Sequence, residues 1–438
     1  MTDTPGSTAP VTGDWLAPVA GRGVTANVGV PGSKSLTNRY LLLAALAESD
    51  SLVRGWLHSR DTALMVEALR ALGAGIEESH GDLRITPIDF SSGDHTAAAS
   101  IDCGLAGTVM RFIPPLAAAT GREVVLDGDE QARVRPMSVI IDALTDLGAS
   151  VSAENGLLPI TIRAESRLRG GHLEVDASAS SQFVSGLLLT APVMPLGIEL
   201  VNRGEPVPSR AHVDMTLEVL ADAGVDVTEP EPERWIVEPG LPRGLDVHVE
   251  PDLSNAAAFA AASLATNGDV TILDWPVHTT QAGDGFRAIA EAFGAAVSLD
   301  RNGLRVQGPE VLRAVDLDLS AVGELTPVVA ALAALADGTS TLTGIGHLRG
   351  HETDRLSALR RELGAVGVEV EEHATALTIT GSQLRARTWH TYNDHRMVMA
   401  GAVLALRVDG LIIENADTVA KTLPEFTQLW EAMLNRGT

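Results

Sequence analysis

The residues best suited to chemistry near the start of the chain are Lys34 and Arg39, within residues 31–39 (PGSKSLTNR). The apolar run that follows, Tyr40 to Ala47, predicts a helix. A turn that opens a helix directs unpaired N–H groups and the positive end of the helix dipole outward, so these charges favour a phosphate or carboxylate ligand. A Walker A loop requires glycine directly before the lysine, where Ser33 stands, so nucleotide hydrolysis is disfavoured.

Further clusters of polar side chains also stand at or near the predicted starts of apolar helices. They are the turn 106–108 with Arg111, Arg135 before Pro136, the run Ser180, Ser181 and Gln182, the segments 351–355 and 392–396, and Lys421. Each cluster alone is typical of an ordinary helix cap. Together they predict that helix dipoles and cations converge on one pair of anionic ligands.

His347 and His351 are four residues apart, a spacing that could hold a metal ion on a helix. Gly346 and Gly350 interleave with them and indicate a turn. No carboxylate-rich ligand set accompanies the two histidines. We therefore expect no metal site.

A unit of helix, glycine and short alternating strand recurs along the chain. The glycines that end five predicted helices are Gly73, Gly148, Gly224, Gly294 and Gly364. They are 75, 76, 70 and 70 residues apart, and glycine suits a left-handed C-cap because it has no Cβ. A sixth predicted helix ends before Gly437, and residues 24–28 are expected to supply its missing strand.

Six such units predict an α/β fold of two similar lobes. Each lobe consists of three repeated α/β units, which form an inside-out α/β barrel. Two crossing strands, near Gly32 and Pro251, join the lobes. We expect residues 15–32 and 251–438 to form the lobe with both chain ends, residues 33–250 to form the inserted lobe, and residues 1–14 to be a disordered tail. A single large α/β domain is the alternative, which the regular spacings disfavour.

Composition limits the possible partners. The chain has 438 residues, 45% of them hydrophobic, and a net charge of −25, which repels nucleic acid and anionic membranes. Its only cysteine, Cys103, excludes an intrachain disulfide and suits a reducing compartment. We expect a cytoplasmic monomer with no signal peptide, no membrane span and small-molecule substrates.

The ordered set of motifs resembles the enolpyruvyl transferase family from about Gly23 to the C-terminus. The resemblance implies transfer of the enolpyruvyl group of phosphoenolpyruvate to the 5-hydroxyl of shikimate 3-phosphate, with release of phosphate. It implies two lobes of three α/β units and neither a metal nor an organic cofactor. It also implies inhibition by glyphosate, which would occupy the phosphoenolpyruvate pocket beside Gly107.

The resemblance also implies a role for each motif residue. The expected phosphoenolpyruvate ligands are Lys34, Gly107, Arg135, Gln182, Arg355, Arg396 and Lys421. The expected shikimate 3-phosphate ligands are Lys34, Ser35, Arg39, Ser180, Ser181, Gln182, Ser209, Glu324 and His351. Glu352 is expected to donate a proton to the methylene carbon of phosphoenolpyruvate. Glu324 is the expected base for the attacking hydroxyl, with Lys34 as its alternative or partner. Lys421 is also expected to take part in catalysis.

Four positions depart from the commonest family pattern: Leu105, His212, His351 and Glu324 stand where asparagine, tyrosine, lysine and aspartate are usual. His351 replaces a permanent charge with a titratable one. Two other functions remain open. One is enolpyruvyl transfer to UDP-N-acetylglucosamine, although loop 127–134 lacks the cysteine of that enzyme, and the other is non-catalytic binding of phosphorylated metabolites.

Overall fold

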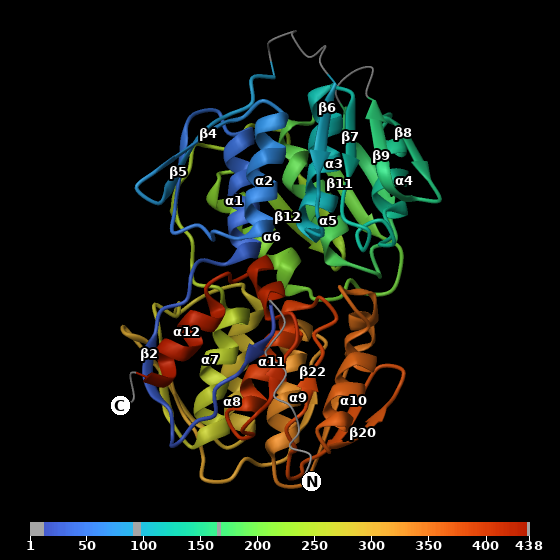
Figure 1. Ribbon diagram of the computed structural model, residues 1–438. Helices are drawn as coiled ribbons and strands as arrows, with labels where there is room; N and C mark the ends of the chain where they lie inside the picture. The colour runs from blue at the N-terminus through green and yellow to red at the C-terminus, as the bar shows by residue number, and fades with distance from the viewer. Residues whose placement is uncertain (1–12, 91–97, 164–167, 436–438) are drawn as a thin grey trace. The chain divides into compact units, whose positions relative to one another are not determined.

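The computed structural model describes residues 13–90, 98–163 and 168–435. They form a mixed α/β fold with six small mixed sheets (Figure 1), which confirms the predicted α/β class. The chain divides into two compact units. The terminal unit comprises the chain up to Gly29, Ser254–Trp275 and the chain from Gly285 on, and the inserted unit comprises Val30–Leu253 and Pro276–Asp284.

The segment Pro276–Asp284 groups with the inserted unit, which no sequence pattern indicated. Its polar side chains explain the grouping. Thr279 Oγ1 and Gln281 Nε2 donate to Glu250 Oε2 at 2.6 and 2.9 Å. Because individual side-chain contacts fix this segment, hydrophobic periodicity could not reveal it.

The inserted unit has six α-helices and twelve strands among its described residues. The helices are α1 (Lys34–Leu46), α2 (Arg60–Ala71), α3 (Gly107–Thr120), α4 (Ser138–Asp146), α5 (Ser181–Thr190) and α6 (Ala211–Asp222). The strands are β3 (Ser51–Arg54), β4 (Gly75–Ser79), β5 (Asp82–Thr86), β6 (Ala99–Asp102), β7 (Val124–Asp127), β8 (Ser150–Glu154), β9 (Leu157–Arg163), β10 (Gly171–Val175), β11 (Ile198–Asn202), β12 (Val227–Glu231), β13 (Arg234–Val237) and β14 (Asp246–His248).

The described part of the terminal unit also has six α-helices and includes three short 3₁₀ turns. The helices are α7 (Leu253–Thr266), α8 (Phe286–Ala292), α9 (Thr326–Leu335), α10 (Arg355–Ala365), α11 (His395–Ala405) and α12 (Phe426–Asn435), and the turns are η3 (Gly323–Leu325), η4 (Gly346–Gly350) and η5 (Ala416–Lys421). The strands are β1 (Trp15–Leu16), β2 (Thr25–Val28), β15 (Asp269–Leu273), β16 (Ala296–Asp300), β17 (Gly303–Gln307), β18 (Asp316–Asp318), β19 (Thr339–Thr343), β20 (Glu369–Glu372), β21 (Leu377–Thr380), β22 (Thr388–Trp389) and β23 (Ile412–Ile413).

The five four-stranded sheets share one topology. In the sheet β6-β7-β9-β8, β6 runs parallel to β7, whereas β9 is antiparallel to both β7 and β8. The same order recurs in β10-β11-β13-β12, β14-β3-β5-β4, β2-β15-β17-β16 and β18-β19-β21-β20. The repeated helix–strand pattern of the sequence therefore corresponds to a repeated sheet.

The sixth sheet has three strands, β1-β23-β22, and it corrects one prediction. Residues 24–28 were expected to complete the sixth unit, but β2 pairs with β15 in another sheet, and Trp15 pairs with Ile413 instead. Alternation identifies a strand without identifying its neighbour. A strand of two residues, such as β1, is too short to show any alternation.

The glycine prediction holds for four of the five positions. Gly73, Gly148, Gly224 and Gly294 have positive φ angles, as a left-handed C-cap requires. Gly364 lies inside α10, and the left-handed glycine after that helix is Gly367, with φ +101°. Gly437 lies outside the described residues.

The predicted disordered tail falls mostly outside the described residues. Its last two residues, Gly13 and Asp14, are hydrogen-bonded instead: Ala416 N donates to Gly13 O at 2.6 Å, and Asn415 N donates to Asp14 Oδ1 at 3.0 Å. The disorder predicted for residues 1–14 therefore does not extend to Gly13 and Asp14.

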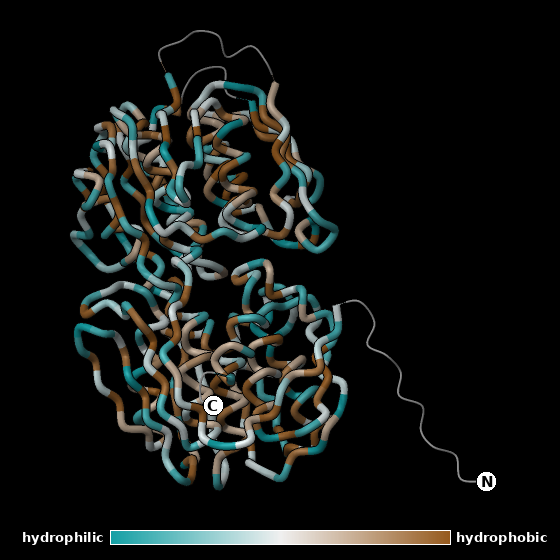
Figure 2. The backbone as a smooth tube through the Cα atoms, turned by 60° about the vertical axis from the view of Figure 1, so that its left-hand side comes forward, coloured by the Kyte–Doolittle hydropathy of each residue, from teal (hydrophilic) through white to brown (hydrophobic). Residues whose placement is uncertain are grey.

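Each unit has three inner helices, α1, α3 and α5 in the inserted unit and α7, α9 and α11 in the terminal unit. Nearly all residues of α3, α5, α9 and α11 are buried, because these helices are apolar on every side. Figure 2 shows hydrophobic stretches of the backbone alternating with hydrophilic ones in both units. Among the described residues, no helix is long and apolar enough to span a membrane.

Candidate active site

In the inserted unit, the three inner helices begin at predicted site residues: α1 at Lys34, α3 at Gly107 and α5 at Ser181. One hydrogen bond and one close approach show that these helix starts are neighbours. Asn38 Nδ2 donates to Thr108 Oγ1 at 2.7 Å, and a Cβ placed on Gly107 would lie 2.8 Å from Gln182 Oε1. Three positive helix ends therefore face one region, which favours an anion there.

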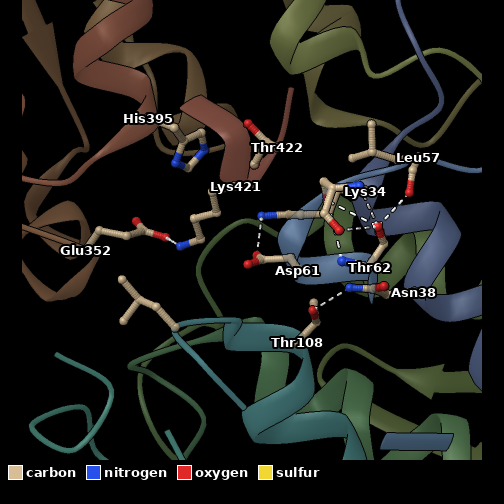
Figure 3. A network of polar contacts seen from close by, with 12 residues as sticks. Lys34, Asn38, Leu57, Asp61, Thr62, Thr108, Glu352, His395, Lys421 and Thr422 are labelled. Carbon is tan, nitrogen blue, oxygen red and sulfur yellow. Dashed lines mark hydrogen bonds and ion pairs between the residues drawn. The ribbon is translucent and has the colours of Figure 1, made fainter. Parts of the chain in front are cut away.

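Lys34 is held at both ends. Its backbone N–H donates to Asp252 Oδ2 at 3.2 Å, and its ammonium Nζ lies 3.3 Å from the buried Asp61 Oδ2 (Figure 3). Ser33 caps the helix by accepting from Leu36 N. The Lys34 side chain is 20% exposed, so its ammonium can reach a ligand while Asp61 orients it.

Gly107 is the point on which two other predicted ligands converge. A Cβ at this position would lie 3.2 Å from Gln182 Nε2 and 3.3 Å from Arg135 NH2. Ala106, the N-cap of α3, has no polar side chain to satisfy the first N–H groups. Arg135 Nε is buried with no hydrogen-bond partner among the described residues. An anion beside Gly107 would meet backbone donors, a guanidinium and an amide.

The predicted serine ligands occupy turns that open helices. Ser180 Oγ accepts from Gln182 N at 3.3 Å, Ser181 is buried at the start of α5, and Ser35 is partly buried in α1. Ser209 adopts a left-handed conformation with φ +53°, two residues before α6. These hydroxyls belong to the same unit as Lys34 and Gln182.

Two predicted cations of the inserted unit lie in its interior. Arg39 donates to Thr216 Oγ1 at 2.8 Å, to His212 O at 2.9 Å and to Ser185 Oγ at 3.2 Å, and burial lowers its pKa to about 9. Arg111 donates to Pro136 O at 3.1 Å and stacks over Phe183. Both guanidinium groups tie the inner helices to their neighbours.

Arg355 is the centre of the charged cluster in the terminal unit. Its guanidinium, 1% exposed, contacts Asp394 Oδ2 at 2.8 Å, Glu352 Oε2 at 3.1 Å and Glu324 Oε2 at 3.3 Å. Burial alone would lower the pKa of Arg355, but the three carboxylates raise it above its ordinary value. The cluster therefore holds a permanent positive charge among acids.

Lys421 and Glu352 form a second pair in the same unit (Figure 3). Lys421 Nζ donates to Glu352 Oε1, and both side chains are at least nine-tenths buried. Glu352 thus contacts two cations, one through each oxygen. An anionic ligand that engaged Lys421 and Arg355 would compete directly with the Glu352 carboxylate.

Arg396 and Glu324 complete this group. Asp394 caps α11 by accepting from Arg396 N at 2.9 Å, while Arg396 Nε lies 3.4 Å from Glu324 Oε2. Burial would raise the pKa of Glu324, but Arg355, His351 and Arg396 hold it well below its ordinary value. Glu324 is therefore ionised at neutral pH, as a general base must be.

His351 lies beside both acids, with Nδ1 3.8 Å from Glu324 Oε1 and 3.9 Å from Glu352 Oε2. Burial and Arg355 lower the pKa of His351 to about 4, so it carries no charge at neutral pH. His347 and His351 lie on and just after the turn η4, not on an α-helix. Across the residues that the structure describes, no group of three or more His, Cys, Asp or Glu could hold a metal ion.

Sequence reasoning missed the acids that orient the cations. Asp61 pairs with Lys34 and Asp394 pairs with Arg355. Asp61 stands in the first turn of a capped helix, where acidic residues are common, so nothing distinguished it. Asp394 lay inside a recognised cluster, and its position before a helix could have indicated an N-cap.

The fold is similar to that of two solved enolpyruvyl transferase structures. EPSP synthase from Acinetobacter baumannii aligns with a TM-score of 0.81 and 24% identity, covering 96% of this chain and 98% of that chain. The enolpyruvyl transferase NikO from Streptomyces tendae aligns with a TM-score of 0.72 and 17% identity, covering 96% and 97%. At these identities the likeness shows the fold alone.

Sequence comparison defines the family. The family model for EPSP synthase (3-phosphoshikimate 1-carboxyvinyltransferase) matches residues 19–430. A 3-phosphoshikimate 1-carboxyvinyltransferase from Kocuria rhizophila is 52% identical over 431 residues, 96% of both chains. The chain belongs to the EPSP synthase family, and its activity is that of a 3-phosphoshikimate 1-carboxyvinyltransferase.

Proposed function

We propose that the chain transfers the enolpyruvyl group of phosphoenolpyruvate to the 5-hydroxyl of shikimate 3-phosphate, which gives 5-enolpyruvylshikimate 3-phosphate and phosphate. The family match over residues 19–430 is the observation that carries this proposal. The hydroxyl oxygen bonds to C2 of phosphoenolpyruvate while C3 gains a proton. Loss of phosphate and of one C3 proton from this tetrahedral intermediate then regenerates the double bond.

Phosphoenolpyruvate is assigned to Lys34, Gly107, Arg135, Gln182, Arg355, Arg396 and Lys421. Two features support this set. The Gly107 turn offers backbone donors next to Arg135 and Gln182. Lys421 and Arg355 share one carboxylate partner, Glu352, which an anionic ligand can replace. The trianionic character of the substrate explains why an acidic chain concentrates cations here.

Shikimate 3-phosphate is assigned to Lys34, Ser35, Arg39, Ser180, Ser181, Gln182, Ser209, Glu324 and His351. Neutral hydroxyl and amide donors at the start of α5 suit phosphate and hydroxyl groups. Arg39 would act mainly by holding α1 against α5 and α6, since it donates to Ser185, Thr216 and His212. His351 would contribute hydrogen bonds without charge.

Glu352 is assigned as the acid and Glu324 as the base. In the free enzyme, the Glu352 carboxylate contacts Arg355 through one oxygen and Lys421 through the other. When phosphoenolpyruvate engages these cations, it replaces the Glu352 carboxylate as their partner. Substrate binding thereby prepares Glu352 to protonate C3. Glu324, which is ionised beside Arg355 and Arg396, accepts the proton of the shikimate 3-phosphate hydroxyl, with Lys34 as its partner. Lys421 stabilises the charge that develops on the intermediate.

We also propose that each unit is a lobe of three repeated α/β units, the inside-out barrel expected from the sequence, and that two crossing strands join the lobes. Support comes from the shared topology of the four-stranded sheets and from the bridge between Gly32 and Pro251. We also propose that the protein is cytoplasmic, because its one cysteine is free and buried. A monomer suffices, because this one chain supplies every assigned ligand.

Phosphate release with two acceptors tests the proposed function. With phosphoenolpyruvate in metal-free buffer containing a chelator, the enzyme should release phosphate only when shikimate 3-phosphate is added. UDP-N-acetylglucosamine should give none, and mass spectrometry should detect the enolpyruvyl ether of shikimate 3-phosphate. Release with the UDP-sugar, or binding of shikimate 3-phosphate without turnover, would overturn the proposal in favour of one of the two alternatives.

A further inference from the structure

Two consecutive residues with left-handed backbone conformations precede the start of α11. Tyr392 has φ +54° and Asn393 has φ +58°, and neither is glycine. L side chains rarely adopt this conformation, and it persists only where the surroundings hold it in place. Asp394, which follows directly, caps α11 and binds Arg355. The strained turn therefore places the acid that orients one of the proposed substrate cations.

The side chain of Glu362 holds this turn. Tyr392 Oη donates to Glu362 Oε1 at 2.6 Å, and the backbone N–H of His390 donates to Glu362 Oε2 at 3.0 Å. Glu362 itself is only 3% exposed, and both of its hydrogen bonds are partly buried. Burial and the Glu362 carboxylate raise the pKa of Tyr392 to about 12, which keeps its hydroxyl a donor at any physiological pH.

The same helix holds both ends of the segment 390–394. Glu362 lies seven residues after Arg355 in α10, two helical turns further along nearly the same face. Arg355 binds Asp394 through Nε at 2.8 Å and NH2 at 3.3 Å, while Glu362 binds His390 and Tyr392. Because α10 is one rigid element, these contacts fix the Asp394 carboxylate relative to Arg355 and to Arg396 at the start of α11.

We propose that Glu362 and Tyr392 are positioning residues for the phosphoenolpyruvate half of the reaction, acting through Asp394 on Arg355 and Arg396. The inference rests on the proposed function, which assigns these two arginines to phosphoenolpyruvate. Neither Glu362 nor Tyr392 is a proposed substrate ligand. Their contribution is to hold two guanidinium groups in the geometry that a trianionic ligand requires.

Steady-state kinetics of Tyr392→Phe and Glu362→Gln test the proposal. Each should raise the KM for phosphoenolpyruvate about fivefold to twentyfold, with the KM for shikimate 3-phosphate unchanged and kcat within about a factor of two. Because both substitutions weaken the same Tyr392–Glu362 hydrogen bond, the double variant should be no worse than the more severe single variant. A purely structural role would lower the thermal midpoint and the active fraction while leaving both KM values unchanged.

Tyr40→Phe is the matched control, since Tyr40 is the only other tyrosine in the chain and its hydroxyl bonds to Asp222 in the inserted unit. It should keep the wild-type KM for phosphoenolpyruvate. Glu362→Gln, which leaves the turn's own residues intact, carries the test if Tyr392→Phe does not fold. Wild-type KM values in the folded variants, or additive effects in the double variant, would overturn the inference. A wild-type enzyme without turnover would instead refute the proposed function.

Discussion

Replacing Gly107 by alanine perturbs the assigned phosphoenolpyruvate site by one methyl group. The new Cβ would lie 2.8 Å from Gln182 Oε1 and 3.3 Å from Arg135 NH2, whereas ordinary contacts begin at 3.4 Å. The amide must therefore retreat by at least 3.4 − 2.8 = 0.6 Å, and the guanidinium by less. Both atoms end flexible side chains, so folding should be little affected. Displacing one charge-assisted hydrogen bond should cost about 1.5 kcal/mol of substrate binding, roughly tenfold in KM.

The assay is steady-state phosphate release at saturating shikimate 3-phosphate, with glyphosate added as a competitor of phosphoenolpyruvate. Gly107→Ala should raise the inhibition constant of glyphosate more than the KM for phosphoenolpyruvate, because the inhibitor is longer and the methyl narrows the slot. Gly364→Ala is the matched control: it lies inside α10 with nothing within 4 Å of the added Cβ and should leave both constants unchanged. Equal losses for inhibitor and substrate, or a wild-type enzyme indifferent to glyphosate, would refute the placement of Gly107.

Two further substitutions test the role of Arg135 in substrate binding and the buried environment of His351. Arg135→Ala should raise the KM for phosphoenolpyruvate by about tenfold to a hundredfold, with a smaller change in kcat. The reason is that the guanidinium binds the ground state and the transition state alike. An unchanged KM in steady-state kinetics would contradict the assignment of Arg135. The second substitution concerns His351, whose pKa is lowered from an ordinary 6.5 to about 4 in the folded protein. Between these pH values the unfolded chain binds more protons than the folded protein. The free energy of unfolding should therefore fall as the pH drops from 6.5 toward 4. Chemical denaturation of His351→Asn at pH 7 and pH 5 should show a smaller loss than wild type, and an identical loss would contradict the stated environment.

The sequence predicted cations near helix starts because helix starts have local signals. Ser33, Ser180 and Asp394 accept from backbone N–H groups in the first turn, as N-cap residues do, and the site residues stand directly beside them. Repeated glycines likewise predicted the α/β class and its repeating units. These features depend on residues within one turn of one another, so spacing alone exposes them.

The partners of those cations could not be predicted, because they come from distant parts of the chain. Asp61 is 27 residues from Lys34, and Asp394 is 39 residues from Arg355. Whether a carboxylate faces a cation or water depends on how helices pack, which no local pattern encodes. The expectation that His351 supplies a titratable charge was also incomplete, since burial beside Arg355 keeps it neutral.

The most direct test of the account measures turnover and binding side by side for Glu352→Gln. Glutamine keeps the size and hydrogen bonding of the side chain but lacks a transferable proton. Turnover should fall by about 10²- to 10⁴-fold, as expected for loss of a general acid, while calorimetric affinity for shikimate 3-phosphate should change little. A Glu352→Gln enzyme with near-normal turnover would contradict the assignment of the proton donor and with it the mechanism.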